Sequence, residues 1–132
     1  MRSYMAERNR QHPVTRALVY SVVLVLVTTG VLWQLDFERA MLMKVHGAAA
    51  MASMLLFGGL LARHVPCGWK TRANRVSGAS LLAAALWLLL SGYALYYAGS
   101  EPLRVFASQS HFWIGLGFAG ALGWHRHQGA RP

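Results

Sequence analysis

Two histidines stand inside long apolar segments of the chain, where imidazole side chains are uncommon. His46 lies in the stretch KVHGAAAMA, and His111 lies in the stretch QSHFWIGLG. Each is placed about five residues inside its apolar segment, which is roughly 8–9 Å along a helix that rises 1.5 Å per residue. Ionisable groups in such segments usually face a bundle interior or mark a functional site. Imidazole is a common ligand of metals and of haem iron, so the pair predicts a metal or haem site at one depth.

The residues beside the two histidines suit a flat cofactor. Gly47 and Ala50 lie close to His46, and Gly115 lies one helical turn after His111. Such small side chains leave room for a porphyrin face. Three cations lie near the same end of the segments and can pair with two haem propionates: Arg39, Lys44 and Arg104. The sequence therefore predicts one haem b with His46 and His111 as axial ligands to the iron.

A second haem with a second histidine pair stays open. His64 follows His46 by 18 residues, and His125 follows His111 by 14 residues. Both spacings keep the two histidines of a helix on roughly one face, but the rises differ, at roughly 27 Å and 21 Å. His64 and His125 also fall at the ends of their segments. One haem is therefore the primary expectation.

The histidines also have interpretations without haem. A histidine in a membrane helix can form a hydrogen bond to a neighbouring helix. Met41, Met43 and His46 spell M-x-M-x-x-H, and thioethers of this kind suit copper(I). Cys67 is the single cysteine of the chain, and no C-x-x-C-H motif occurs, so covalent haem attachment is not indicated.

Long uncharged segments must position these side chains. The 132-residue chain is 55% hydrophobic and only 13% charged, whereas average proteins carry about 25% charged residues. No Asp, Glu, Lys or Arg occurs in residues 17–35, 45–62, 76–100 or 105–124. A helix of about 20 apolar residues spans the hydrocarbon core of a bilayer. We therefore expect an all-α integral membrane protein.

Four spanning helices are expected, at about residues 14–35, 37–63, 75–98 and 102–125. Pro66 and Gly68 are expected to break the chain after the second helix, in a loop of about a dozen residues. The short connections favour an up-down-up-down four-helix bundle. Residues 14–125 then form one transmembrane domain, between an N-terminal tail (1–13) and a C-terminal tail (126–132). In such a bundle the second and fourth helices run in the same direction on opposite corners, so their histidines can clamp one cofactor.

The basic residues predict the orientation of these helices. Ten of the 13 Lys and Arg residues fall in the two tails and the central loop, whereas three of the four acidic residues fall on the other side. The positive-inside rule therefore places both termini in the cytoplasm. The formal net charge of +9 is then explained by topology and by contact with anionic lipid headgroups. Nucleic-acid binding is not expected, because no basic patch alternates with aromatic residues in a soluble module.

Four helices with histidines on the second and fourth resemble the bacterial four-helix membrane cytochrome b superfamily, which includes the cytochrome b subunits of hydrogenase and formate dehydrogenase. The resemblance covers residues 14–125 and is carried by VHG at His46 and by HFWIG at His111. It implies a bacterial-type inner membrane, electron transfer between a redox partner subunit and quinone, and axial ligation by His46 and His111. His64 and His125 match a second ligand pair poorly.

The expected function is therefore that of a membrane electron carrier: a small b-type cytochrome within a larger redox complex, with its haem near the external side. It is a carrier subunit rather than a stand-alone catalyst, because four acidic residues assemble neither a catalytic triad nor a carboxylate dyad. A cofactor-free structural or assembly subunit is the alternative, in which the histidines only bond to neighbouring helices. A visible spectrum of the purified protein separates the two.

Overall fold

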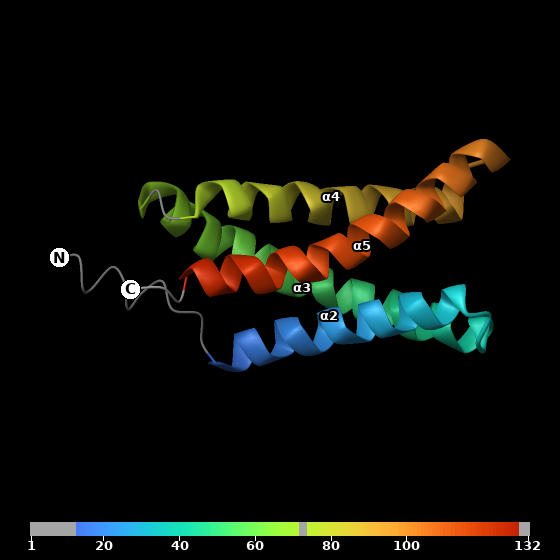
Figure 1. The fold of residues 1–132 in the computed structure, drawn as a ribbon, viewed down its shortest axis with the longest axis horizontal. Coiled ribbons are helices and arrows are strands. Elements are labelled where there is room, and N and C mark those ends of the chain that lie inside the picture. Colours follow the sequence, from blue (N-terminus) through green and yellow to red (C-terminus); the bar gives the residue numbers. More distant parts are fainter. Residues whose placement is uncertain (1–12, 72–73, 130–132) are drawn as a thin grey trace. The chain divides into compact units, whose positions relative to one another are not determined.

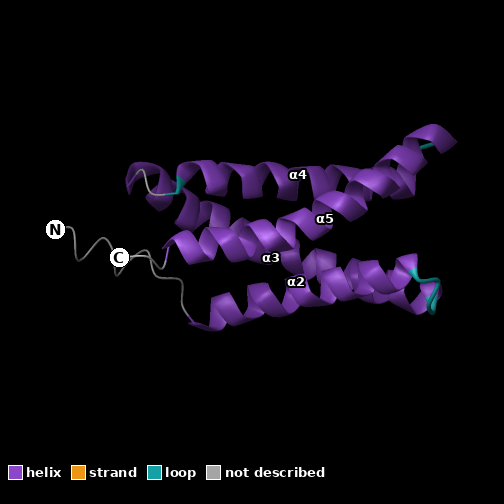
Figure 2. Ribbon diagram, viewed as in Figure 1, coloured by secondary structure: helices purple, strands orange, loops and turns teal. Residues whose placement is uncertain are grey.

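Helices account for nearly all of the chain that the structure describes. The computed structural model describes residues 13–71 and 74–129, and within them it contains four helices and no strand (Figure 2). The helices are α2 (Pro13–Gln34), α3 (Arg39–Thr71), α4 (Arg75–Tyr97) and α5 (Glu101–Gly129). The expected all-α fold is confirmed. The expected N-terminal tail lies outside the described residues as far as position 12, and so does the C-terminal tail from position 130, because α5 continues to Gly129.

The chain divides into two compact units, Met1–Ala73 and Asn74–Pro132. In the first unit α2 packs against α3, and in the second unit α4 packs against α5. Each unit is a helical hairpin, whose two helices run in opposite directions and are joined by a short turn (Figure 1). The antiparallel pairing of neighbouring helices is therefore observed within each unit. Closure of the four helices into one bundle stays a prediction.

Local sequence explains where the helices begin. α2 starts at Pro13, whose fixed φ suits the first helical position and whose missing N–H is not needed there. α5 starts at Glu101 and Pro102, which adds a carboxylate that interacts favourably with the positive end of the helix dipole. Glu101 also pairs with Arg104, and in the α2–α3 turn Asp36 pairs with Arg39 at 2.6 Å.

α3 does not end where the sequence predicted. Pro66 was expected to break the chain, but it lies inside α3, which continues to Thr71. Proline removes one backbone N–H and crowds the carbonyl group four residues earlier. Membrane-type helices tolerate this loss, because neighbouring groups and small local adjustments satisfy the backbone group that is set free. The expected loop of about a dozen residues is therefore wrong; positions 72–74 connect the helices, and of these only Asn74 is described.

Three described helices, α2, α3 and α4, are long and apolar enough to cross a membrane. α5 has sufficient length but a lower hydropathy, since Ser108, Gln109 and Ser110 precede His111 in its first half. The surfaces agree with an apolar environment: Leu55 is 81% exposed and Val76 is 82% exposed. Exposing such side chains to water is unfavourable by about 25 cal/mol per Å². The fourth span, in α5, stays a prediction.

Candidate cofactor site

Each of the two predicted ligand histidines is held by a hydroxyl group of its own unit. In the first unit His46, on α3, lies 2.7 Å (Nδ1 to Oγ1) from Thr29 on α2. In the second unit His111, on α5, lies 2.9 Å (Nδ1 to Oγ) from Ser91 on α4. The two hairpins therefore repeat one arrangement, in which an imidazole of the second helix bonds to a hydroxyl of the first helix.

The hydroxyl groups determine which ring nitrogen carries the proton. The Thr29 hydroxyl donates to the carbonyl oxygen of Val25 at 2.7 Å, and the Ser91 hydroxyl donates to that of Trp87 at 2.7 Å. A hydroxyl has only one hydrogen to donate, so its oxygen must accept from the imidazole. We therefore assign the proton of both histidines to Nδ1, by analysis of the hydrogen bonds. In this tautomer the lone pair that can ligate a metal is on Nε2.

A glycine next to each hydroxyl makes room for the ring. A Cβ atom on Gly30 would lie 3.9 Å from Cε1 of His46, and a Cβ atom on Gly92 would lie 3.5 Å from Cε1 of His111. Both distances are van der Waals contacts for a methyl group, and a longer side chain would meet the ring. The helix that faces each histidine thus supplies a hydroxyl–glycine dipeptide.

A third copy of this arrangement is present in the second unit. His125 Nδ1 lies 2.8 Å from Ser77 Oγ, and a Cβ atom on Gly78 would lie 3.6 Å from Cε1 of His125. We call each combination a histidine set: Thr29–Gly30 with His46, Ser91–Gly92 with His111, and Ser77–Gly78 with His125. In the second unit the two sets are separated by 14 residues on both helices, so their geometry repeats along the hairpin.

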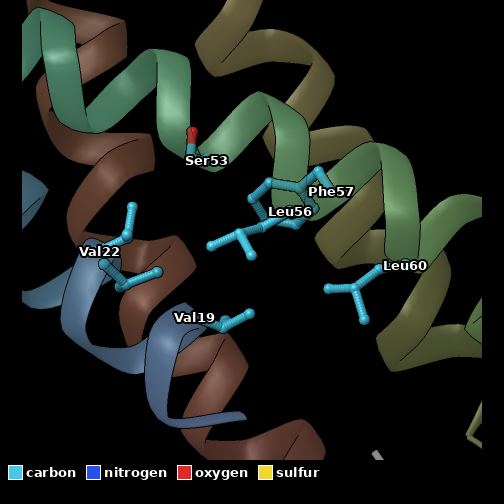
Figure 3. A pocket seen from close by; sticks show the side chains of 7 residues that line it. Val19, Val22, Ser53, Leu56, Phe57 and Leu60 are labelled. Atoms are coloured by element: carbon cyan, nitrogen blue, oxygen red, sulfur yellow. The ribbon is translucent and has the colours of Figure 1, made fainter. Parts of the chain in front are cut away.

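The first unit has apolar side chains where a matching second set would lie. Leu60 follows His46 by the same 14 residues, and it lines a small cavity of about 10 Å³ together with Val19, Ser53 and Phe57 (Figure 3). A cavity of this size holds at most about one water molecule. The nearest histidine on α3, the half-buried His64, stands four residues beyond Leu60. The register of His64 therefore differs from that of His125, as the unequal spacing in the sequence indicated.

The small residues predicted to clear a porphyrin have different surroundings. A Cβ atom on Gly115 would lie 3.7 Å from Cδ2 of Leu88, so Gly115 faces α4 of its own unit. Nothing lies within 4 Å of the corresponding position at Gly47, and Ala50 is half-buried. Packing between helices therefore explains Gly115, whereas clearance for a cofactor stays a prediction for Gly47 and Ala50.

Two of the three predicted propionate partners already pair with acidic residues of the same turn. Arg39 bonds to Asp36 and lies over the ring of Trp33, with 5.6 Å between its guanidinium carbon and the ring centroid. Arg104 bonds to Glu101 through Nε at 3.1 Å. Lys44 is exposed. Because the Arg39 and Arg104 side chains are about half exposed, their ion pairs are weak and compatible with exchange for another carboxylate.

The available donors fit a haem better than a bare metal ion. Within the described residues no three His, Cys, Asp or Glu side chains gather in one place. Structural zinc requires four protein ligands and catalytic zinc requires three. A haem requires only one or two from the protein, since the porphyrin supplies the rest, and neutral imidazole with its lone pair on Nε2 is a usual donor.

The sequence analysis missed the hydroxyl–glycine dipeptides. Thr29–Gly30 precedes His46 by 17 residues, and Ser91–Gly92 precedes His111 by 20 residues, in both cases on the preceding helix. A search for Ser-Gly or Thr-Gly at the depth of each histidine would have found them. Comparison of the chain with known protein families, with curated proteins and with solved structures found no match.

Proposed function

We propose that this protein is a membrane electron-transfer protein, a b-type cytochrome in which His46 and His111 are the axial ligands of one haem b. The observation that supports this most is the repeated histidine set: each unit presents one imidazole in the Nδ1–H tautomer, bonded to a hydroxyl and lying against a glycine. Haem-ligating histidines need this tautomer, because iron binds the nitrogen that carries the lone pair.

Haem, when bound, supplies a reversible one-electron couple of its iron. The contribution of the chain is to hold the two imidazoles, to exclude water with apolar side chains, and to offer cations to the propionates. Gly47, Ala50 and Gly115 border the ligands, and the cations are Arg39, Lys44 and Arg104. No residue of the chain needs to exchange a proton with a substrate, which agrees with a carrier subunit of a larger redox complex.

The proposal includes a membrane location. α2, α3 and α4 are apolar enough to span a bilayer, and we infer that α5 is a fourth span, lying in the inner membrane of a bacterial-type cell. With both termini in the cytoplasm, His46 and His111 lie near the external side. A redox partner subunit or quinone then exchanges electrons with the haem.

A second haem is supported on one side only. His125 belongs to a histidine set, as His46 and His111 do, which favours it as a ligand. In the first unit the matching position is Leu60, and His64 would have to serve from a different register. The ratio of haem to protein decides between one and two sites, and a ratio of two that falls to one in His125→Ala would establish the second.

The alternative is a cofactor-free structural or assembly subunit. The same hydrogen bonds favour it, since each of them links the two helices of a hairpin, and bonds of this kind stabilise membrane helix pairs by about 0.6 kcal/mol on average. In this case the histidines are complete as packing residues, and the purified protein has no visible absorption.

A visible spectrum tests the proposal directly. Protein purified from haem-replete cells should show a low-spin Soret band and, after reduction with dithionite, a sharp alpha band. His46→Ala and His111→Ala should each lose that spectrum. His127→Ala is the matched control, because His127 is exposed on α5 and belongs to no histidine set. Colourless protein would refute the cytochrome, and full haem content in His46→Ala would refute the ligand assignment.

A further inference from the structure

We propose that the hydroxyl groups of Thr29 and Ser91 are positioning residues, which fix the tautomer and ring plane of His46 and His111 and thereby lower the reduction potential of the haem. The inference rests on the proposed function, since a potential exists only when haem is bound. It assigns a role to two residues that would not touch the cofactor.

Burial distinguishes these two hydroxyls from the others. Thr29 is 6% exposed and Ser91 is 4% exposed, and they are the buried polar residues of the described chain. Burying a polar group is unfavourable unless it is hydrogen-bonded. Each of the two units nevertheless places a buried hydroxyl opposite its histidine, although alanine would fill the same space without a polar group.

The hydroxyls do not need the imidazoles for their own hydrogen bonds. Thr29 donates to the carbonyl oxygen of Val25, and Ser91 donates to that of Trp87, as serine and threonine commonly do within helices. Each hydroxyl hydrogen is thus already used on its own helix. The second bond serves the imidazole, because it supplies an acceptor for Nδ1–H in an apolar environment.

The glycines confine the ring from the other direction. Nδ1 of His111 is bonded to Ser91, while Cε1 of the same ring lies 3.5 Å from the Cβ position of Gly92. His46 has the same neighbours in Thr29 and Gly30, with 3.9 Å to the Cβ position. Rotation of either ring breaks the hydrogen bond or drives the ring toward the helix, so the direction of Nε2 is fixed.

The expected effect on the haem has a definite sign. Donation from Nδ1–H raises the basicity of the ligating nitrogen. A more basic ligand stabilises the oxidised iron more than the reduced iron, so the bond lowers the potential. Loss of one hydroxyl should therefore raise the ratio of reduced to oxidised haem at a fixed potential by about three- to tenfold; tenfold corresponds to about 59 mV for one electron.

The first test does not require haem. Nitrogen NMR of the haem-free protein, labelled with ¹⁵N-histidine, reports the protonated ring nitrogen. His46 should be protonated at Nδ1 in the wild type and in Thr29→Ser, and should become a mixture of tautomers in Thr29→Val, which keeps the volume but lacks the hydroxyl. Ser53→Ala is the control, because the Ser53 hydroxyl donates to the carbonyl of Ala50 in the same unit.

The second test measures the midpoint potential of the haem-loaded protein. Thr29→Val and Ser91→Ala should each raise it, and Thr29→Ser and Ser91→Thr should restore it, whereas a merely structural hydroxyl would change stability without moving the potential. Haem-loaded protein with unchanged potential and tautomers in both variants overturns the positioning role and leaves the cytochrome intact. Colourless protein in which Thr29→Val still alters His46 overturns the cytochrome and upholds the role of the hydroxyl as a tautomer anchor.

Discussion

Enlarging Gly92 should displace His111 and release haem. A Cβ atom at this position already lies 3.5 Å from Cε1 and 3.9 Å from Nδ1 of His111. The further carbons of a leucine side chain extend beyond this contact into the ring. The ring cannot withdraw without losing its 2.9 Å bond to Ser91. Gly92→Leu should therefore remove the hydrogen bond and misdirect Nε2.

The magnitude follows from overpacking. Inserting extra carbons into a packed site destabilises it by about 1–3 kcal/mol, which corresponds to roughly 5- to 150-fold in an equilibrium constant, at about 1.4 kcal/mol per factor of ten. Haem affinity should fall by at least about fivefold in Gly92→Leu. Gly92→Ala should keep its haem, because the methyl group makes an ordinary contact and alanine stabilises a helix by up to about 1 kcal/mol relative to glycine.

Haem content per protein, measured by the absorption of the reduced haem, is the appropriate assay. Gly117→Leu is the control, since Gly117 is exposed and no atom lies within 4 Å of its Cβ position. Gly30→Leu provides an independent copy of the experiment in the first unit. Wild-type haem content and an unchanged spectrum in both leucine variants at Gly30 and Gly92 would refute the proposed confinement of the rings.

Three further outcomes are expected. Pro66→Ala should raise the thermal midpoint in detergent, because it restores a backbone donor inside α3; a lower midpoint would mean that the proline is needed there. An impermeant maleimide should label Ser100→Cys in intact cells and native Cys67 only after permeabilisation, and the reverse pattern would invert the proposed topology. Arg39→Gln should change the free energy of unfolding by less than about 1 kcal/mol, because its ion pair with Asp36 is exposed, yet it should lower the haem midpoint potential; an unchanged potential argues against a propionate contact.

The helix positions were largely predictable because they depend on local composition. The uncharged segments around residues 17–35 and 76–100 led to helices within a residue or two of α2 and α4. The end of α3 was missed, since a single proline is a weak signal inside an apolar segment: whether the helix stops at Pro66 depends on how the neighbouring backbone groups are satisfied. α5 also extends beyond its predicted end at residue 125, to Gly129.

The sequence by itself determined the helical class, the pairing of neighbouring helices and the choice of His46 and His111, because apolar length, short turns and rare imidazoles are all visible along the chain. Only the tertiary structure identified what holds those imidazoles. Thr29 and Ser91 are ordinary residues of apolar helices until packing brings each within 3 Å of a histidine on the next helix. The physical reason is that a hydrogen bond between helices depends on the rotation of both, and side chains 17 or 20 residues apart reveal that rotation only once the hairpin has formed.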